Sequence, residues 1–305
     1  MRQQFAAEAF KPIPQPKELV PEELKQNLPL TLKKEINMKK KRVSWEKVLL
    51  VAKEIVESSE LSMTLRQLFY QLVSRGLIPN TQSYYGHLSK KTAAARREEI
   101  FPDFIDATRE IHEYLSFQSP VQAKEWLSLR YRRNRTEGQE FSLYLGVEKR
   151  GLVVQLKHWF SDYGVPILCL GGYSSQTYVN TVVLHVAQQK RPSVLIYAGD
   201  FDPSGEDIHR DFVARTDCWG IVERVALNED QISKYNLVPQ MGKTTDPRAL
   251  AFVEKYGELS QTELDALTPK QLKSVYMEAF KNYFDFEMYE KVLEKEAEER
   301  ESLCA

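Results

Sequence analysis

The chain has 305 residues, of which 42% are hydrophobic and 28% are charged, and its formal net charge is −1. This length allows two modest domains with extensions. No apolar run approaches the roughly 18 residues needed to span a bilayer, so we expect no membrane association. The cysteines Cys169, Cys218 and Cys304 lie far apart, so neither a zinc site nor a disulfide framework is expected, and a cytoplasmic location fits.

The near-neutral total charge conceals a segregated distribution. Basic runs occur at 39–42, 90–97 and 130–135, whereas an acidic segment covers 294–301. Each run alone is typical of a solvated surface, but together they favour a polyanionic partner such as DNA. The predicted phosphate contacts in the second run are Lys90, Lys91, Arg96 and Arg97.

The N-terminal half is predicted to be an arm followed by a helical domain. Residues 1–42 are rich in proline and indicate an irregular arm with one short helix near 21–27. Within 43–135, helices are predicted from Ser44, from Thr64 and over 83–97. Three short helices with a basic third one indicate a winged-helix-like DNA-binding domain, for which residues 112–118 are the candidate β-ribbon.

The central region, 136–240, changes to alternating strands and helices. Apolar strands are predicted at 141–147, 167–170 and 194–198, with helices over 152–160 and 175–189 between them. Short connections between such elements predict an α/β fold with a parallel, Rossmann-like sheet covered by helices. Residues 241–305 are predicted to form a helical extension.

Acidic residues end two of these strands. Asp200 and Asp202 follow the third strand, and Glu148 ends the first. Carboxyl ends of parallel strands meet at one edge of a sheet, so these carboxylates are predicted to hold Mg²⁺ or Mn²⁺. Lys149 and Arg150 beside Glu148 are expected to face phosphates. The alternative is that Asp202 only caps a turn.

These motifs resemble the Toprim domain. A glutamate after one strand, Gly171-Gly172-Tyr173, and Asp200-Phe201-Asp202-Pro203-Ser204-Gly205 are most similar to the A subunit of topoisomerase VI and the related meiotic double-strand-break protein. The resemblance covers roughly residues 60–230. It implies that Glu148, Asp200 and Asp202 bind Mg²⁺ next to double-stranded DNA. It also implies a homodimer in which the tyrosine of one subunit meets the metal site of the other.

The resemblance also points to a nucleophile. The family pattern Arg-x-x-Tyr-Tyr corresponds to Arg66-Gln67-Leu68-Phe69-Tyr70, with Phe69 replacing the first tyrosine. Tyr70 falls off the apolar stripe of its helix and lies one turn from Arg66. A neighbouring cation is expected to stabilise a phenolate, whose ordinary pKa is about 10. The alternative is a tyrosine that packs at a domain interface.

The expected function is magnesium-dependent DNA cleavage with Tyr70 and Arg66 as catalytic residues beside the metal site. One alternative is a hydrolytic Toprim nuclease without a covalent intermediate, as in relatives associated with chromosome-structuring complexes. Another is a non-catalytic DNA-binding subunit. Gly242-Lys243-Thr244 lacks the upstream glycine of a P-loop, so an ATPase activity would have to come from a partner. The stretch Glu263–Leu267 either supplies a further acid or only begins a helix.

Overall fold

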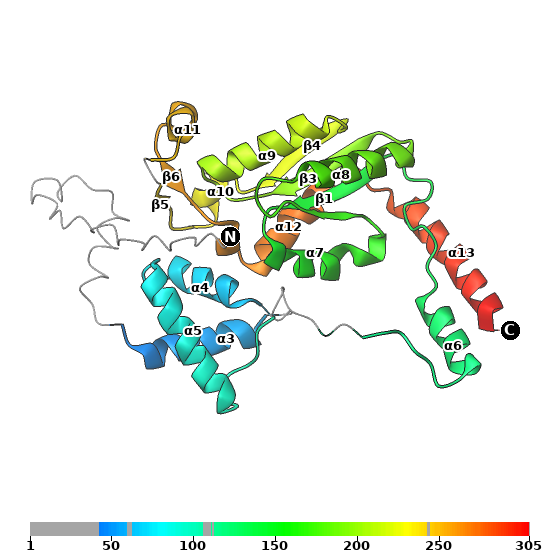
Figure 1. Cartoon of the computed structure of the whole chain (residues 1–305), viewed down its shortest axis with the longest axis horizontal. Helices are drawn as coiled ribbons and strands as arrows, with labels where there is room; N and C mark the ends of the chain where they lie inside the picture. Colours follow the sequence, from blue (N-terminus) through cyan, green and yellow to red (C-terminus); the bar gives the residue numbers. More distant parts are fainter. Residues whose placement is uncertain (1–42, 60–62, 106–110, 112, 243–244, 305) are drawn as a thin grey trace, which may run out of the picture. The chain divides into compact units, whose positions relative to one another are not determined.

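The computed structural model describes residues 43–59, 63–105, 111, 113–242 and 245–304 (Figure 1). All of them belong to one compact unit, Val43–Ala305. The predicted arm and its short helix near 21–27 lie outside the described residues. In the described ranges, no helix is both long enough and apolar enough to cross a bilayer.

Three helices make up the first part of the described chain, as the sequence predicts: α3 (Trp45–Glu57), α4 (Leu65–Ser74) and α5 (Gln82–Arg97). A capping box begins α4, because Thr64 Oγ1 accepts from Gln67 N at 3.2 Å and Gln67 Oε1 accepts from Thr64 N at 2.8 Å. Residues 113–117 form no strand, so the predicted β-ribbon is absent from these positions.

A four-stranded parallel sheet follows, which confirms the predicted α/β class. Its strand order is β2-β1-β3-β4, with bounds β1 Ser142–Val147, β2 Ile167–Cys169, β3 Ser193–Ala198 and β4 Ile221–Ala226. The chain leaves β1 toward one edge to form β2 and returns to the other side of β1 to form β3. The carboxyl ends of β1 and β3 therefore flank the point where the strand order reverses, which is where ligands bind in open α/β sheets.

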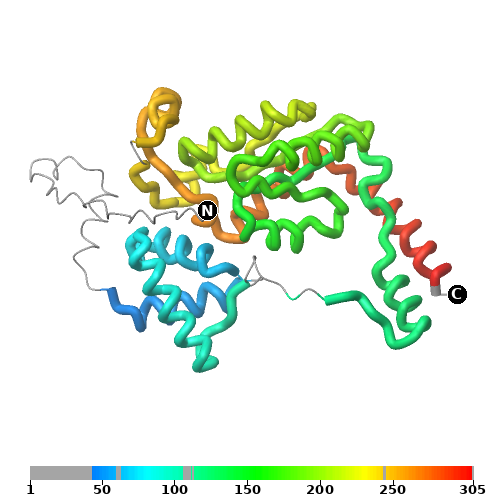
Figure 2. The backbone as a smooth tube through the Cα atoms, viewed as in Figure 1, coloured from blue at the N-terminus to red at the C-terminus, as the bar shows by residue number. Residues whose placement is uncertain are grey.

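Helices cover both faces of the sheet (Figures 1 and 2). One face carries α7 (Val153–Phe160) and α12 (Pro269–Phe280), and the other carries α8 (Gln176–Gln189) and α9 (Pro203–Thr216). Every residue of β1 and β3 is buried, with alternate side chains entering the two cores. These central strands therefore read as continuous apolar runs, which explains why the sequence predicts them well.

The C-terminal region is mainly helical, as predicted, but it also contains a short antiparallel strand pair. Its elements are α10 (Glu229–Lys234), β5 (Gln240–Met241), α11 (Ala249–Tyr256), β6 (Ser260–Gln261), α12 and α13 (Phe286–Cys304). The segment after β6 returns to the carboxyl end of β3, and this return places further residues beside the sheet.

The third basic run is partly used inside the fold. Arg135 Nη2 pairs with Glu296 Oε1 of α13 at 2.7 Å, and Arg133 pairs with Glu299. Glu296 is buried and also accepts from Arg300 at 2.7 Å. These contacts fasten the segment after α6 (Pro120–Arg130) to the acidic helix. The expectation that this whole run is a free basic surface is therefore wrong for Arg133 and Arg135.

Replacing Glu296 with glutamine should lower the free energy of unfolding by about 1–3 kcal/mol, because two arginines lose their charged partner. Glu298 is exposed on the same helix. Glu298→Gln should change stability by less than about 0.5 kcal/mol. Urea denaturation of the two variants and the wild type measures the difference. Equal denaturation midpoints for all three proteins would show that the ion pairs of Glu296 do not contribute to stability.

Candidate functional site

Glu148 and Asp200 meet at the carboxyl ends of β1 and β3. The strands are paired up to Val147 and Ala198, and Glu148 N donates to Ala198 O at 3.0 Å. Glu148 Oε2 then accepts from the backbone N–H of Asp200 at 2.9 Å. The predicted adjacency of these two acids is therefore present, and we call the residues that gather around them (Glu148, Lys149, Asp200, Glu263 and Asp265) the acidic centre.

Asp200 is the buried member of the pair, with 5% of its surface exposed. Its Oδ1 accepts from Leu264 N at 2.8 Å, and its Oδ2 pairs with the ammonium of Lys149. Burial raises the pKa of Asp200 well above its usual range, Lys149 opposes this, and the nearby Glu148 and Glu263 carboxylates add to it. The site thus gathers more negative charge than its surroundings readily stabilise.

Lys149 lies between two carboxylates rather than facing outward. Its Nζ pairs with both Asp200 and Glu263, and only 17% of its side chain is exposed. Burial alone would lower the pKa of Lys149, but Asp200 and Glu263 raise it above its ordinary value. Lys149 therefore carries its charge within the acidic centre. The sequence, which predicts a phosphate contact here, gives no sign of this pairing.

A segment from the far end of the chain completes the acidic centre. Phe201 N donates to Thr262 O at 2.9 Å, and Thr262 N donates to Phe201 O at 2.8 Å. This antiparallel bridge holds the next residues, Glu263 to Asp265, against the end of β3. The sequence leaves open whether Glu263–Leu267 supplies a further acid or only begins a helix. In the structure, Glu263 and Asp265 of this stretch lie at the acidic centre.

Arg66 and Tyr70 of α4 reach the same segment. Arg66 Nη2 pairs with Glu263 Oε2 at 2.8 Å, and its Nε pairs with the buried Asp265 Oδ2 at 3.2 Å. The Tyr70 hydroxyl donates to Glu263 Oε1 at 3.0 Å and lies 3.4 Å from Arg66 Nη2. Hydrogen bonds and ion pairs thus join Tyr70, Arg66, Lys149, Asp200 and Glu148 through Glu263.

The electrostatics of this cluster disfavour the phenolate form of Tyr70. Burial and the Glu263 carboxylate raise the pKa of Tyr70 above its ordinary value, and they outweigh the opposing effect of Arg66. Burial would also raise the pKa of Glu263, but Lys149 and Arg66 lower it to about 2. As predicted, Arg66 lowers the pKa of Tyr70. Because Arg66 also pairs with the carboxylates of Glu263 and Asp265, this effect is smaller than the combined effect of burial and Glu263.

Asp202 caps a helix in the structure through one of its two carboxylate oxygens. Its Oδ1 accepts from Gly205 N at 2.6 Å and caps α9, which is the alternative considered for this residue. Pro203, the first residue of α9, follows this cap directly. Gly205 packs closely enough against Asp200 that a side chain there would collide with the backbone.

The donors suit a hard divalent cation in kind. All of them are carboxylate oxygens, and they lie close together at the carboxyl ends of β1 and β3. Beside them, the buried hydroxyl of Tyr197 has no hydrogen-bond partner among the described residues. A Cβ on Gly199 would lie 2.6 Å from that hydroxyl and 3.0 Å from Glu148 Oε2. In the described residues, no group of three His, Cys, Asp or Glu side chains is arranged to hold a metal ion. Lys149 provides the positive charge there.

The other predicted DNA contacts are not members of the acidic centre. Lys90, Lys91 and Arg97 are exposed on α5, whereas Arg96 is half-buried, pairs with Asp103 at 3.6 Å and stacks on Phe104. Arg150 is exposed beside Gly171. No hydrogen bond joins these five cations to the acidic centre in the part of the chain that is described.

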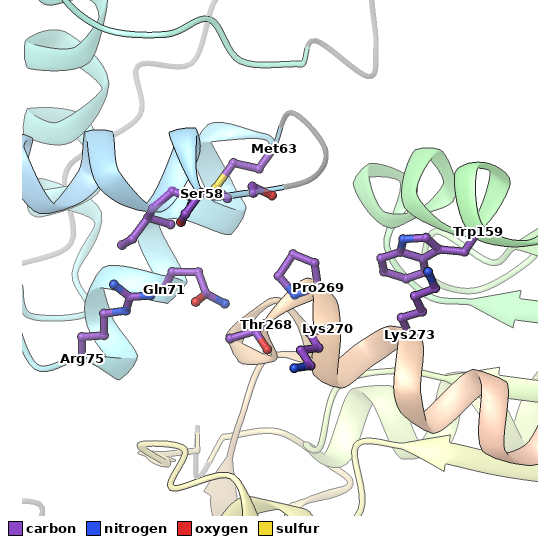
Figure 3. A pocket seen from close by; sticks show the side chains of 11 residues that line it. Ser58, Met63, Gln71, Arg75, Trp159, Thr268, Pro269, Lys270 and Lys273 are labelled. Carbon is purple, nitrogen blue, oxygen red and sulfur yellow. Dashed lines mark hydrogen bonds between the residues drawn. The ribbon is translucent and has the colours of Figure 1, made fainter.

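A separate cavity of about 510 Å³ lies between α3, α4 and the start of α12 (Figure 3). Its lining contains no carboxylate and none of the predicted catalytic residues; it consists of Ile55, Ser58, Ser59, Met63, Gln71, Arg75, Trp159, Thr268, Pro269, Lys270 and Lys273. Gln71 Nε2 donates to Leu267 O at 2.9 Å, so the same 260–267 segment also anchors α4 from this side. The cavity is therefore distinct from the acidic centre.

Comparison with protein-family models and with curated proteins finds no match to this chain. The functional conclusion below therefore rests on the geometry of the site and on the residues that form it.

Gly205→Ala should destabilise the protein by about 1–3 kcal/mol, because the new methyl group would be placed 2.4 Å from the Asp200 carbonyl oxygen. Gly86 on α5 is a matched control, since nothing lies within 4 Å of a Cβ there. Gly86→Ala should stabilise by up to about 1 kcal/mol through helix propensity. Thermal unfolding measures both, and equal effects would contradict the tight approach at Gly205.

Proposed function

We propose that this protein is a Toprim-like, metal-dependent enzyme that cleaves double-stranded DNA, with Tyr70 as its nucleophile. The observation that carries the proposal is the connection between two predicted groups that lie far apart in the sequence. The Tyr70 hydroxyl bonds to Glu263, and Lys149 joins Glu263 to Asp200. A tyrosine, two cations and several carboxylates thus meet at the switch point of a parallel sheet.

The residues that would hold Mg²⁺ or Mn²⁺ are Glu148, Asp200 and Asp202. A bound divalent ion supplies stabilisation of the charge that develops on the phosphate and on the leaving oxygen. Asp200 is fixed for this task by its bond to Leu264 N, and Glu148 by its bond to the Asp200 backbone.

The chain's own residues account for the covalent step. The Tyr70 oxygen attacks phosphorus, forming a phosphotyrosyl bond, while the bond from phosphorus to the leaving sugar oxygen breaks. The Tyr70 hydroxyl proton is released to solvent water, and the leaving sugar oxygen takes up a proton from solvent water, so no net proton is gained or lost. Arg66, within 3.4 Å of the hydroxyl, stabilises negative charge on the entering oxygen.

DNA would be positioned by cations outside the acidic centre. Lys90, Lys91 and Arg97 are exposed on α5 and Arg150 is exposed after β1, so these side chains are available to phosphates. Arg96 would contribute less, because it already pairs with Asp103. A homodimer, an ATPase or chromosome-structuring partner and a place at the nucleoid in the cytoplasm belong to the same proposal.

A second candidate function is hydrolytic cleavage without a covalent intermediate. The observation that favours it is the hydrogen bond from the Tyr70 hydroxyl to the Glu263 carboxylate, which together with burial raises the pKa of Tyr70. A phenol held in this way is a poor nucleophile until its surroundings change. In this case water would attack the phosphate, and Tyr70 would be a packing residue on α4.

Supercoiled plasmid incubated with the protein and Mg²⁺ or Mn²⁺ distinguishes these functions. Samples are stopped with detergent and run with and without protease. We expect cut DNA that enters the gel only after protease, its loss in Tyr70→Phe, and its retention in the control Tyr84→Phe, because Tyr84 packs on Trp45 of α3. Free nicked DNA from wild type and Tyr70→Phe alike would establish the hydrolase. DNA binding without cleavage would leave a non-catalytic subunit.

A further inference from the structure

The cavity between α3, α4 and the start of α12 is lined by cations and by no acidic side chain. Figure 3 shows Arg75 on the α4 side of this cavity and Lys270 and Lys273 on the α12 side. None of these three cations forms a salt bridge with any residue in the described ranges. Their charges are therefore available to a ligand, whereas those of Lys149 and Arg66 are paired with carboxylates of the acidic centre.

The position of Lys270 is not explained by the stability of the fold. Lys270 is the second residue of α12, and the helix dipole disfavours positive charge in the first turn of a helix. Its side chain is also exposed, so it covers little apolar surface. Lys273 lies one turn further along and on the same face of the helix. A negatively charged group in the cavity would interact favourably with both lysines.

The remaining lining of the cavity suits a flat molecule with polar edges. Trp159 of α7 contributes aromatic surface, and Met63 and Pro269 contribute apolar surface. The buried hydroxyl oxygen of Ser59 has no hydrogen-bond partner among the described residues, so it is available to a bound molecule. The volume of about 510 Å³ lies within the range of roughly 300–1,000 Å³ that is typical of small-molecule sites.

An open groove of about 650 Å³ continues from the cavity along α12. Lys270 and Lys273 line both the cavity and the groove, and the groove extends to Lys281, with Glu278 as an acidic neighbour. A further cation therefore lies along the same helix, where additional phosphates of a longer ligand would lie.

We propose that this cavity binds a nucleotide. The phosphate group would pair with Arg75, Lys270 and Lys273, because cations without acidic neighbours favour a multiply charged anion. The base would pack against Trp159 and the adjoining apolar surface. Two sources share this chemistry: a free nucleotide, and a nucleotide of a DNA strand whose next phosphates follow α12. The cavity contains none of the residues proposed for cleavage, so the inference does not depend on the proposed function.

Isothermal titration calorimetry of the full chain in EDTA tests the proposal. The chelator ensures that no nucleotide is held through a divalent ion at the acidic centre. The titrants are ATP, tripolyphosphate and a short single-stranded oligonucleotide. We expect ATP to bind at least about fivefold more tightly than tripolyphosphate, which has as many phosphates but no ring to stack on an aromatic side chain.

A pair of lysine variants locates the binding. Lys270→Ala with Lys273→Ala should weaken ATP binding about tenfold or more, because charge-assisted contacts to phosphate are lost. The matched control replaces Lys291 and Lys295, which are exposed on α13, and should bind ATP as the wild type does. Arg75→Ala, on the other side of the cavity, is a second test with the same expected direction.

Thermal unfolding separates a binding role from a structural one. The variant with Lys270→Ala and Lys273→Ala should melt at the wild-type temperature or slightly above it, since α12 loses an unfavourable charge at its start. A lower melting temperature together with weaker binding would favour a structural role and contradict the assignment of these lysines to the ligand.

The titrations also distinguish the two sources. Tighter binding of ATP than of the oligonucleotide would support the proposal with a free nucleotide as the ligand. Tighter binding of the oligonucleotide, weakened by the same two substitutions, would support it with a DNA strand along α12. Equal affinity for ATP and tripolyphosphate, equal affinity of the cavity and control variants, or no binding of any titrant would overturn the proposal.

Discussion

The pairing of Phe201 with Thr262 is the contact on which the site depends. Two backbone hydrogen bonds, 2.8 and 2.9 Å long, join the residue after Asp200 to a strand-like segment 61 positions later. Because Leu264 N then donates to Asp200, and Glu263 and Asp265 face α4, this bridge sets the relative positions of both halves of the site. Without it, the acids at the ends of β1 and β3 would have no connection to Tyr70.

The carboxylates of the acidic centre are balanced by two cations. Four carboxylates, from Glu148, Asp200, Glu263 and Asp265, surround Lys149 and Arg66, and two of these carboxylates are almost fully buried. Buried ions are stable only when they are paired, and Lys149 and Arg66 supply this pairing in the structure. A divalent ion would compete with Lys149 for Asp200, and it would thereby alter the surroundings of Glu263 and Tyr70.

Much of this architecture could be predicted from the sequence, because it depends on local patterns. The continuous apolar strands, the helices between them and the position of Tyr70 beside Arg66 all follow from periodicity. The meeting of Glu148 with Asp200 follows from parallel strand geometry. The docking of Glu263 on Tyr70 does not, since it depends on a bridge between segments far apart in the chain. The pairing of Arg135 with Glu296 could not be predicted for the same reason. Taken separately, a basic run and an acidic helix each indicate a solvated surface, and nothing local shows that the two meet.

We have proposed that Asp200 and its neighbours form a divalent-cation site beside Tyr70. Titration of the full chain with Mn²⁺, followed by the electron paramagnetic resonance signal of the free ion, tests this most directly. Asp200→Asn removes the buried charge, while Asp217→Asn removes a carboxylate at the far end of α9 as the control. We expect wild type and Asp217→Asn to bind Mn²⁺ alike and Asp200→Asn to bind it at least tenfold more weakly, a difference of about 1.4 kcal/mol. Indistinguishable binding curves for all three proteins would contradict it.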